Sequence, residues 1–202
     1  IAIPPTLLIS AMGIVDDINR CVTMNAKAAG NHLLLVGVTT NELGGSHLAL
    51  LQSPPMAMGG LCPRVDLNAA PRQLATVAEL IAAGLVASAH DCSEGGLLVA
   101  AAEMAFAGRL GLDVNLDGVP RDGLLSDLAA CFAETPSRIL IEVSPGDFDA
   151  VVKQLTTAGI SVGEIGQFND SSQLTVRSDA AGELMSESLD TLRDAWLKPL
   201  DW

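Results

Sequence analysis

The sequence contains few aromatic and few basic residues. Phe, Trp and Tyr make up 3% of its 202 residues, and Tyr is absent. Proteins that hold single-stranded nucleic acid stack bases on aromatic side chains, so the composition argues against such a platform. There are 11 Lys and Arg residues against 24 Asp and Glu, for a net charge of -13. This balance argues against the positive surface that nucleic acid or an anionic membrane requires.

The cysteines form no recognisable motif. Cys21, Cys62, Cys92 and Cys131 stand far apart, without the C-x-x-C pair typical of zinc or redox sites. We therefore expect reduced thiols and a cytoplasmic protein. No apolar run reaches the roughly 18–20 residues that span a bilayer, and no signal-peptide pattern is present. Because the chain begins with Ile1 rather than Met, we expect a piece of a longer protein.

Apolar residues make up 49% of the chain and charged residues 17%, which allows a sizeable core. Helix and strand patterns alternate, and the end resembles a hairpin, so we expect an α+β fold with three α/β/α layers around a mixed sheet. The expected strands are 6–10, 32–39, 85–89, 110–116, 139–143, 160–165 and 174–176. The expected helices are 71–83, 96–107, 124–132, the segment between Ser144 and Gly159, and 186–197. Residues 53–63 are expected to form an exposed, mobile loop.

One stretch, Leu85–Leu97, combines a short apolar run, a polar loop and the start of a helix. Asp91 and Ser93 are good N-cap residues, and the free N–H groups of a helix start favour an anion. Gly95 and Gly96 each cost about 1 kcal/mol relative to Ala inside a helix. The sequence therefore predicts that a ligand or another segment approaches this backbone closely, with an ordinary capped helix start as the alternative.

A second glycine loop is present. The loop Glu42–Ser46 follows an apolar strand, as phosphate-cradling loops do, although a tight turn explains it equally well.

Two features of the helices stand out. Helix 96–107 is apolar on nearly every side, which predicts burial between two layers or against a partner. An Ala-Gly pair ends a helix before a strand twice, at Ala83-Gly84 and at Ala158-Gly159.

Several motifs occur in a specific order along nearly the whole chain. They are Ile3-Pro4-Pro5-Thr6 with Gly13 and Asp16-Asp17, Glu42-Leu43-Gly44-Gly45-Ser46, Val65-Asp66-Leu67, Ala89-His90-Asp91-Cys92-Ser93-Glu94-Gly95-Gly96-Leu97, Ala102-Glu103-Met104-Ala105-Phe106-Ala107-Gly108 and Glu134-Thr135-Pro136-Ser137-Arg138. Their combination resembles the C-terminal part of the phosphoribosylformylglycinamidine synthase subunit II family, within the aminoimidazole-ribonucleotide synthetase superfamily.

The resemblance implies the α/β domain of a second repeat, in which each repeat is an ATP-binding domain followed by an α/β domain. Residues 1–20 would end the preceding ATP-binding domain or form a linker, and residues 21–202 would form the C-terminal α/β domain. The family is an ATP-dependent C–N ligase that converts formylglycinamide ribonucleotide to its amidine in purine biosynthesis. ATP or ADP and magnesium would be bound mainly by the absent ATP-binding domain, so the chain alone is expected to be inactive. The implied partners are that domain, the first repeat and a glutaminase subunit.

By the same resemblance, three places could face a nucleotide or substrate phosphate, and no residue is assigned to catalysis. They are the two glycine loops and the turn of Glu134 and Arg138, whose guanidinium suits a phosphate. The candidate binding residues are Gly44, Gly45, Ser46, His90, Asp91, Ser93, Gly95, Gly96, Glu134 and Arg138. Because the second repeat is often degenerate, we expect a scaffold or an auxiliary nucleotide or phosphate site.

Two alternatives stay open. Selenophosphate, thiamine-phosphate and hydrogenase-maturation enzymes of the superfamily share an Asp-x-x-x-Gly-Gly loop, but are not expected to share both the Glu-Leu-Gly-Gly-Ser stretch and the Glu-x-Pro-Ser-Arg turn. The other alternative is an interaction domain that binds no ligand. His90 and the cysteines show no spacing that pairs a nucleophile with a base, so glutaminase chemistry is not expected here.

Overall fold

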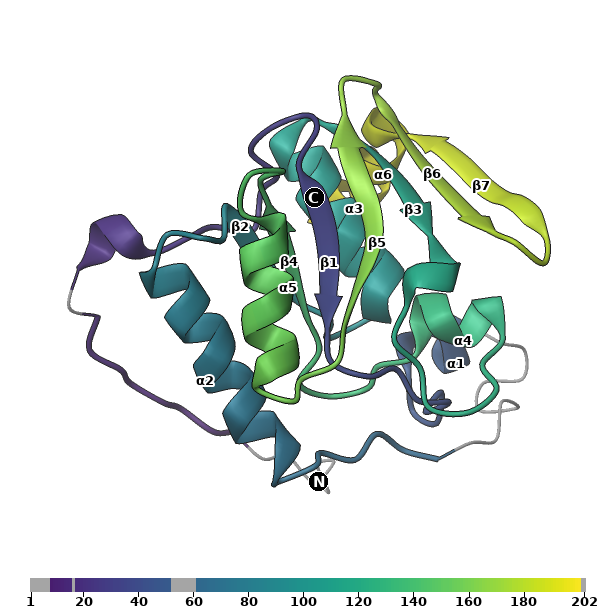
Figure 1. Cartoon of the computed structure of the whole chain (residues 1–202). Coiled ribbons are helices and arrows are strands. Elements are labelled where there is room, and N and C mark those ends of the chain that lie inside the picture. The colour runs from purple at the N-terminus through teal and green to yellow at the C-terminus, as the bar shows by residue number, and fades with distance from the viewer. Residues whose placement is uncertain (1–7, 16, 52–60, 201–202) are drawn as a thin grey trace.

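The computed structural model describes residues 8–15, 17–51 and 61–200 (Figure 1). The strands are β1 (His32–Val36), β2 (Ser88–Asp91), β3 (Gly111–Asn115), β4 (Ile139–Val143), β5 (Val162–Asn169), β6 (Gln173–Ser178) and β7 (Gly182–Ser188). The α-helices are α1 (His47–Leu51), α2 (Ala69–Ala82), α3 (Gly96–Gly108), α4 (Asp127–Phe132), α5 (Phe148–Thr157) and α6 (Leu189–Leu197). Short 3-10 helices are η1 (Ile18–Arg20), η2 (Leu116–Gly118) and η3 (Lys198–Leu200).

These strands form a single mixed sheet, as the sequence predicted, and their order is β2-β4-β1-β5-β3-β6-β7. β3 and β6 run parallel, and the other neighbouring pairs are antiparallel. β1 lies between β4 and β5, and its apolar run Leu33–Val36 is completely buried. A strand covered on both faces needs such a continuous apolar run, because both sets of alternating side chains are inside.

Helices cover both faces of the sheet, which confirms the predicted three-layer arrangement (Figure 1). Leu33 and Leu35 of β1 belong to one core cluster, together with residues of α3, α4 and α6. Leu34 and Val36 belong to the other cluster, together with residues of α2 and α5. Alternate residues of one strand therefore anchor two separate helical layers.

The apolar helix α3 is enclosed by the domain itself. Besides the sheet, it contacts α4 and α6, and Leu97, Ala101, Met104 and Ala105 are fully buried. Its single acid, Glu103, accepts hydrogen bonds on its carboxylate from other side chains of the domain. Of the two explanations for an all-round apolar helix, burial between layers of the same domain is the one observed.

Helices α2 and α5 each bury one side, and they end alike. Gly84 and Gly159, which follow them, have φ angles of 75° and 69°, the left-handed region that glycine enters without strain. The N–H of the next residue then donates to a carbonyl of the last turn, from Leu85 to Leu80 and from Ile160 to Leu155. The repeated Ala-Gly pair is thus a repeated helix stop.

Several element predictions are wrong in detail. Residues 8–10 form no strand, and residues 6 and 7 lie outside the described part. β2 begins at Ser88 rather than at residue 85, and α1 was not predicted. The sequence also missed β7, because Gly182–Ser188 has two apolar residues and little alternation, yet it pairs along β6. Most of the loop expected at 53–63 lies outside the described residues.

A buried carboxylate fixes the segment that precedes β1. Glu142 of β4 is fully buried and accepts hydrogen bonds from the backbone N–H groups of Lys27 and Ala28. The side chains of Asn31 and Ser88 donate to the same carboxylate. Because a buried charge is costly unless hydrogen bonds satisfy it, this network selects one path for residues 27–31.

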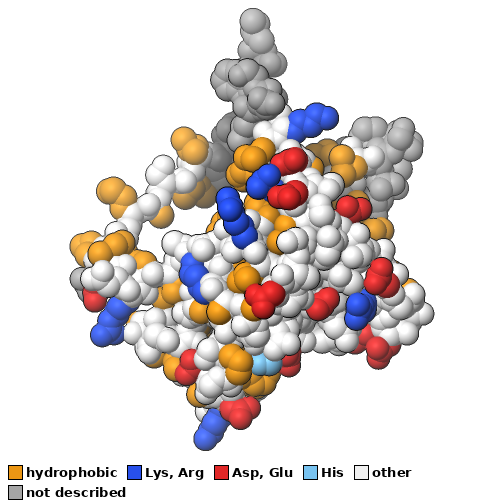
Figure 2. Space-filling view, turned by 90° about the horizontal axis from the view of Figure 1, so that it is seen from above, with side chains coloured by type: hydrophobic (Ala, Val, Ile, Leu, Met, Phe, Trp, Pro, Cys, Tyr) orange, Lys and Arg blue, Asp and Glu red, His pale blue; other side chains and the backbone are white. Residues whose placement is uncertain are grey.

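The surface is mixed in charge, and apolar side chains are strongly exposed near the start of the described chain. In the view of Figure 2, Lys and Arg side chains are scattered among Asp and Glu. Between residues 8 and 18, Leu8, Ile9, Met12, Ile14 and Ile18 are each at least 75% exposed. Within the described ranges, no helix has the length and apolar character to cross a membrane.

Candidate functional site

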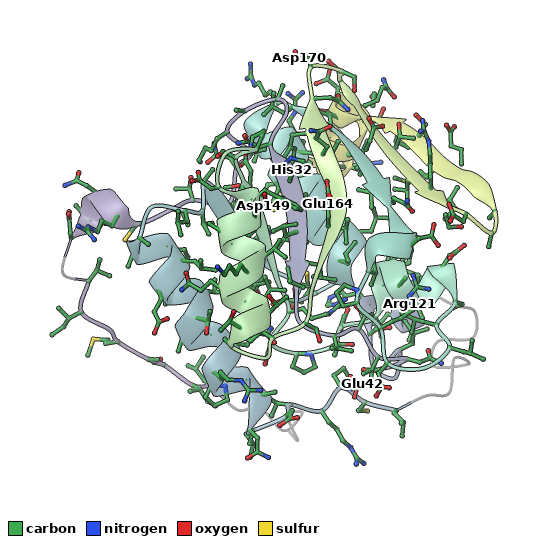
Figure 3. The ribbon with its side chains drawn as sticks, viewed as in Figure 1. His32, Glu42, Arg121, Asp149, Glu164 and Asp170 are labelled. Carbon is green, nitrogen blue, oxygen red and sulfur yellow. The ribbon has the colours of Figure 1, made fainter. Side chains whose placement is uncertain are left out.

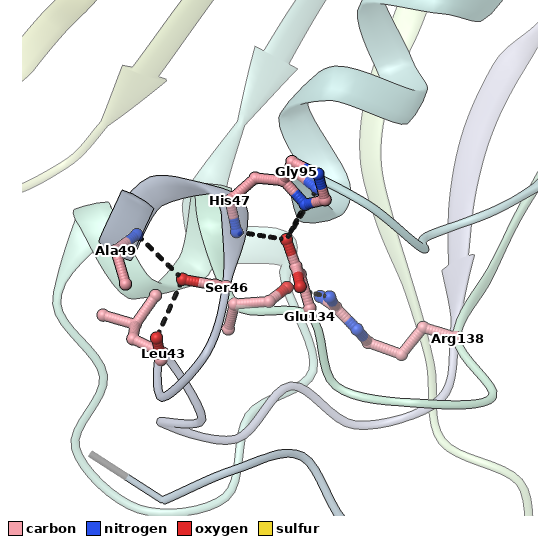
Figure 4. A network of polar contacts seen from close by, with 8 residues as sticks. Leu43, Ser46, His47, Ala49, Gly95, Glu134 and Arg138 are labelled. Carbon is pink, nitrogen blue, oxygen red and sulfur yellow. Dashed lines mark hydrogen bonds and ion pairs between the residues drawn. The ribbon is translucent and has the colours of Figure 1, made fainter. Parts of the chain in front are cut away.

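Antiparallel pairing brings three predicted loops to one edge of the sheet. Val36 at the end of β1 and Asp91 at the end of β2 both pair with Ile139, the first residue of β4. The loop after β1, the glycine loop after β2 and the turn before β4 therefore meet. Figure 4 shows this junction, with Glu134 at its centre.

Glu134 connects the two glycine loops. Its Oε1 accepts the backbone N–H of Gly95 at 2.8 Å and that of His47 at 2.9 Å (Figure 4). The ring Nδ1 of His47 lies 3.2 Å from the same oxygen. The N–H of Gly95 lies at the start of α3, where the helix dipole favours negative charge. The chain's own carboxylate thus occupies the place that the sequence predicted for an anion.

The same contacts change the acidity of Glu134. Burial by itself raises the pKa of this carboxyl group. The hydrogen bonds from the backbone N–H groups of His47 and Gly95, and the contact with the His47 ring, outweigh burial, so its pKa lies below the usual value. Glu134 is therefore ionised at neutral pH, as a resident anion must be.

Arg138 lies in the same turn but points into the protein. It is 1% exposed, and burial lowers the pKa of its guanidinium. Its N–H groups donate to the carbonyls of Ala133 and Thr135 and to the hydroxyl of Thr39 at 3.0 Å. In this arrangement Arg138 shapes the turn from inside, and its donors are engaged by protein groups.

The loop Glu42–Ser46 is also held by internal bonds. Gly45 has a φ of 76°, which requires glycine-like freedom at this turn. Ser46 Oγ accepts the N–H of Ala49 at 3.2 Å and donates to the Leu43 carbonyl at 2.8 Å (Figure 4). The N–H of Gly44 donates to the carbonyl of Leu61 at 3.1 Å. Ser46 thereby caps the short helix α1.

Glu42, labelled in Figure 3, is the first residue of this loop and ties it to its neighbours. The carboxylate of Glu42 accepts the hydroxyl of Thr40 at 2.6 Å and the N–H of Arg64 at 3.1 Å. The backbone N–H of Thr40 in turn donates to the hydroxyl oxygen of Thr135 at 3.2 Å. The loop is therefore tied both to the chain after residue 61 and to the Glu134–Arg138 turn.

Steric contacts explain why positions 95 and 96, at the start of α3, are glycine. Both have positive φ, 79° at Gly95 and 72° at Gly96. A Cβ on Gly96 would lie 2.6 Å from the Ala133 carbonyl oxygen, and one on Gly95 would lie 2.5 Å from the Val99 side chain. Of the two causes that the sequence left open, close packing by another segment is the one that the structure shows for Gly96.

The remaining candidates of this loop face α3 and α6 rather than Glu134. His90 Nε2 lies 2.7 Å from Glu103 Oε2, and the indole N–H of Trp196 donates to Glu103 Oε1 at 2.9 Å. Ser93 donates its hydroxyl to Asp91, and this bond is the main reason why the pKa of Asp91 is lowered. The polar chain from Ser93 to Trp196 therefore links the loop to the C-terminal helix.

Sequence reasoning missed His47 and Thr135. His47 directly follows Ser46, so the only signal was its place at a helix start. His47 contacts Glu134, 87 positions away, and Thr135 contacts Thr40, 95 positions away. A local sequence pattern does not reveal contacts between residues so far apart. Through these two residues the segment after β1 is held to the turn before β4.

Burial keeps two of the four thiols unreactive. Burial raises the pKa of Cys92 to about 11 and that of Cys131 to about 12, so both stay protonated. Over the described ranges, no group of three or more His, Cys, Asp or Glu residues is arranged to hold a metal ion.

Comparison with known proteins gives consistent matches. The chain is 36% identical over 99% of its length to the phosphoribosylformylglycinamidine synthase subunit PurL of Deinococcus radiodurans. It is 37% identical over 96% of its length to the PurL subunit of Moorella thermoacetica. It spans about a quarter of these curated relatives, 26% and 25% of their lengths.

Solved structures share the fold at lower identity. The structure of T. maritima PurL complexed with FGAR superposes with a TM-score of 0.77 and 20% identity, over 87% of this chain and 30% of that one. E. coli HypE, a hydrogenase maturation protein, gives a TM-score of 0.58 and 16% identity, over 83% of this chain and 51% of HypE. Residues 28–179 match the model of the AIR synthase related protein, C-terminal domain. The resemblance seen in the sequence is thereby confirmed, and the chain belongs to the AIR synthase related protein, C-terminal domain family.

Proposed function

We propose that the chain is the C-terminal α/β domain of a phosphoribosylformylglycinamidine synthase, the ATP-dependent C–N ligase of purine biosynthesis. The observation that carries this proposal is identity of 36–37% to PurL subunits over 96–99% of the chain. In such an enzyme, phosphate is placed on the amide oxygen of formylglycinamide ribonucleotide, and ammonia then displaces it. The chain supplies part of this enzyme and is inactive alone.

Within that enzyme, the domain serves as a scaffold or an auxiliary nucleotide or phosphate site. The donors that a phosphate would need are engaged internally, since Gly95 donates to Glu134 and Arg138 donates to Thr39. His90 contacts Glu103 rather than lying free for proton transfer. An auxiliary site would use the exposed side chains of this edge, Ser93 and His47, with the two glycine loops as its frame.

Nucleotide and magnesium belong mainly to the ATP-binding domain that would precede this chain. T. maritima PurL, whose fold this chain shares, has been solved in complexes with ATP, ADP and AMPPCP.

Residues 1–20 would join the α/β domain to its ATP-binding partner. The apolar side chains exposed between residues 8 and 18 are of the kind that a neighbouring domain buries. Ile14 and Val15 also line a cavity of about 720 Å³ with Ala78 and Ile81 of α2, a space that a neighbouring domain would fill. PurLQS from Thermotoga maritima shares the fold, with a TM-score of 0.72. By the resemblance seen in the sequence, a glutaminase subunit would be a further partner, in the cytoplasm.

A different superfamily member is the second candidate. The observation in its favour is the shared fold with E. coli HypE, at a TM-score of 0.58. The PurL superposition is closer, with a TM-score of 0.77, and both the Glu42–Ser46 stretch and the Glu134–Arg138 turn are present. These observations favour the purine enzyme.

Calorimetric titration with ADP and magnesium, and then with formylglycinamide ribonucleotide, tests the role of the domain. His47→Ala and Ser93→Ala remove exposed side chains of the candidate edge, and Ser172→Ala is the matched control on a distant turn. Binding that weakens in the first two variants alone supports an auxiliary site. Absence of binding at millimolar ligand leaves the scaffold role. Loss of activity when the chain is deleted from the full-length enzyme supports either role, whereas retained activity contradicts both.

A further inference from the structure

One carboxylate oxygen holds together two loops that are far apart in the sequence. Glu134 Oε1 accepts the N–H of Gly95 in the loop before α3 and the N–H of His47 after the other glycine loop. These residues lie 39 and 87 positions from Glu134. Neither N–H has another acceptor among the described residues. The relative position of the two loops therefore depends on this oxygen.

The contact is electrostatic as well as geometric. Charge-assisted hydrogen bonds to a carboxylate are about twice as strong as neutral ones. Over the described residues, the ring of His47 is the one basic group within ion-pair distance of Glu134. The nearby guanidinium of Arg138 directs its donors to Ala133, Thr135 and Thr39 instead. The negative charge of Glu134 is thus stabilised by two backbone N–H groups, the ring of His47 and the helix dipole.

We propose that Glu134 is a positioning residue that fixes the two glycine loops relative to each other and keeps the start of α3 closed to phosphate. A phosphate that approached Gly95 would meet a like charge and a donor already in use. The part of the inference that concerns phosphate rests on the proposed function, whereas the positioning role stands on the contacts alone.

Glutamine at this position separates charge from shape. Glu134→Gln keeps a side-chain oxygen of similar reach and removes the charge, whereas Glu134→Ala removes the acceptor. Glu103→Gln is the matched control, because Glu103 is a similarly covered acid, with side-chain exposure of 20% against 16%, and contacts neither loop amide.

Amide hydrogen exchange by NMR on the full chain tests the positioning role. We expect exchange at Gly95 and His47 to rise at least tenfold in Glu134→Ala and less in Glu134→Gln. The N–H of Gly96, which donates to the Ser93 carbonyl at 3.1 Å, is expected to keep its rate. Unchanged rates at Gly95 and His47, or an equal rise at every amide of α3, overturn the proposal. A purely structural role of the residue would produce that uniform rise.

Titration with inorganic pyrophosphate tests the closing role. We expect no saturable shift of the Gly95 amide in the unmodified chain and in Glu103→Gln, and at least tenfold tighter binding in Glu134→Ala. A saturable Gly95 shift of equal strength in the unmodified chain overturns the closing role. If exchange responds as expected but no variant binds pyrophosphate, the closing role and a phosphate site at this loop both fail, and the positioning role is supported. Unchanged exchange refutes positioning whatever the titration gives.

Discussion

The two faces of the sheet are covered by helices of different character. On one face, α3 is apolar on all sides and lies between the sheet, α4 and α6. On the other face, α2 and α5 are amphipathic, and the outer side of α2 is exposed, as Leu74 shows at 49%. A helix's own pattern thus records how many layers cover it: one stripe means one covering layer, and an apolar circumference means two.

A charge placed on one alanine of each helix gives the largest expected difference between the faces. Ala101 of α3 is fully buried and Ala78 of α2 is exposed, so we expect Ala101→Glu to unfold the chain. An unpaired buried charge costs several kcal/mol, comparable with the roughly 5–15 kcal/mol that stabilise a domain. Ala78→Glu is expected to change stability by no more than about 0.5 kcal/mol. Urea denaturation followed by circular dichroism measures both, and a folded, stable Ala101→Glu chain would refute the tight burial of α3.

Truncation of a buried leucine is expected to cost a similar free energy of unfolding in the core cluster on either face of the sheet. Leu97 of α3 and Leu80 of α2 are both completely buried. Leu97→Ala and Leu80→Ala should each reduce the free energy of unfolding by about 2–5 kcal/mol, through lost burial and a residual cavity. The same denaturation measurement applies, with exposed Leu74→Ala as the control. A cost confined to Leu97 would mean that the α2 layer contributes little to the core.

Helix caps provide a smaller contrast. Ser126 and Ser188 cap α4 and α6 with side-chain oxygens, whereas Asn68 before α2 makes no such bond. Ser126→Ala is expected to cost about 1 kcal/mol, and Asn68→Ala less. Thermal unfolding curves of the two variants would show this order. The reverse order would indicate that Asn68 acts through contacts other than capping.

The smallest expected effect is a difference in acid sensitivity. Glu134 near α3 and Asp66 before α2 each accept two backbone N–H groups, and the pKa of each carboxyl lies below its usual value. Since the folded pKa is the lower one, each contact stabilises above the unfolded pKa and is lost as pH falls through the folded pKa. Asp66 is fully exposed, so we expect Glu134→Gln to flatten the acidic limb of stability against pH more than Asp66→Asn does. Equal curves would contradict this ranking.

The sequence predicted those elements whose burial pattern is strong. The apolar run of β1 and the stripes of α2 and α5 gave their positions, and Gly84 and Gly159 gave the ends of the two helices. β7 was missed because its outer position in the sheet leaves it polar, so its stability comes from pairing with β6 rather than from a buried face.

At the candidate site, the sequence located the three loops but not the contacts within them. Gly95 and Glu134 were both predicted as binding residues, and in the structure the N–H of Gly95 donates to Glu134 Oε1 at 2.8 Å. The direction of a side chain depends on neighbours from distant parts of the chain, which is why the inward course of Arg138 and the pairing of His90 with Glu103 were not predicted.

The central place of β1 affects how the chain reaches its fold. Its neighbours β4 and β5 begin at residues 139 and 162, more than a hundred residues after β1 ends. Sheets built from such non-local pairs fold slowly, because a long loop must close before any contact repays it. At about 5–20 residues per second, a ribosome would need roughly 5–20 s to make the strand that covers β1. The apolar run Leu33–Val36 is thus synthesised well before its partner strands, and until they are made it is an exposed, aggregation-prone segment.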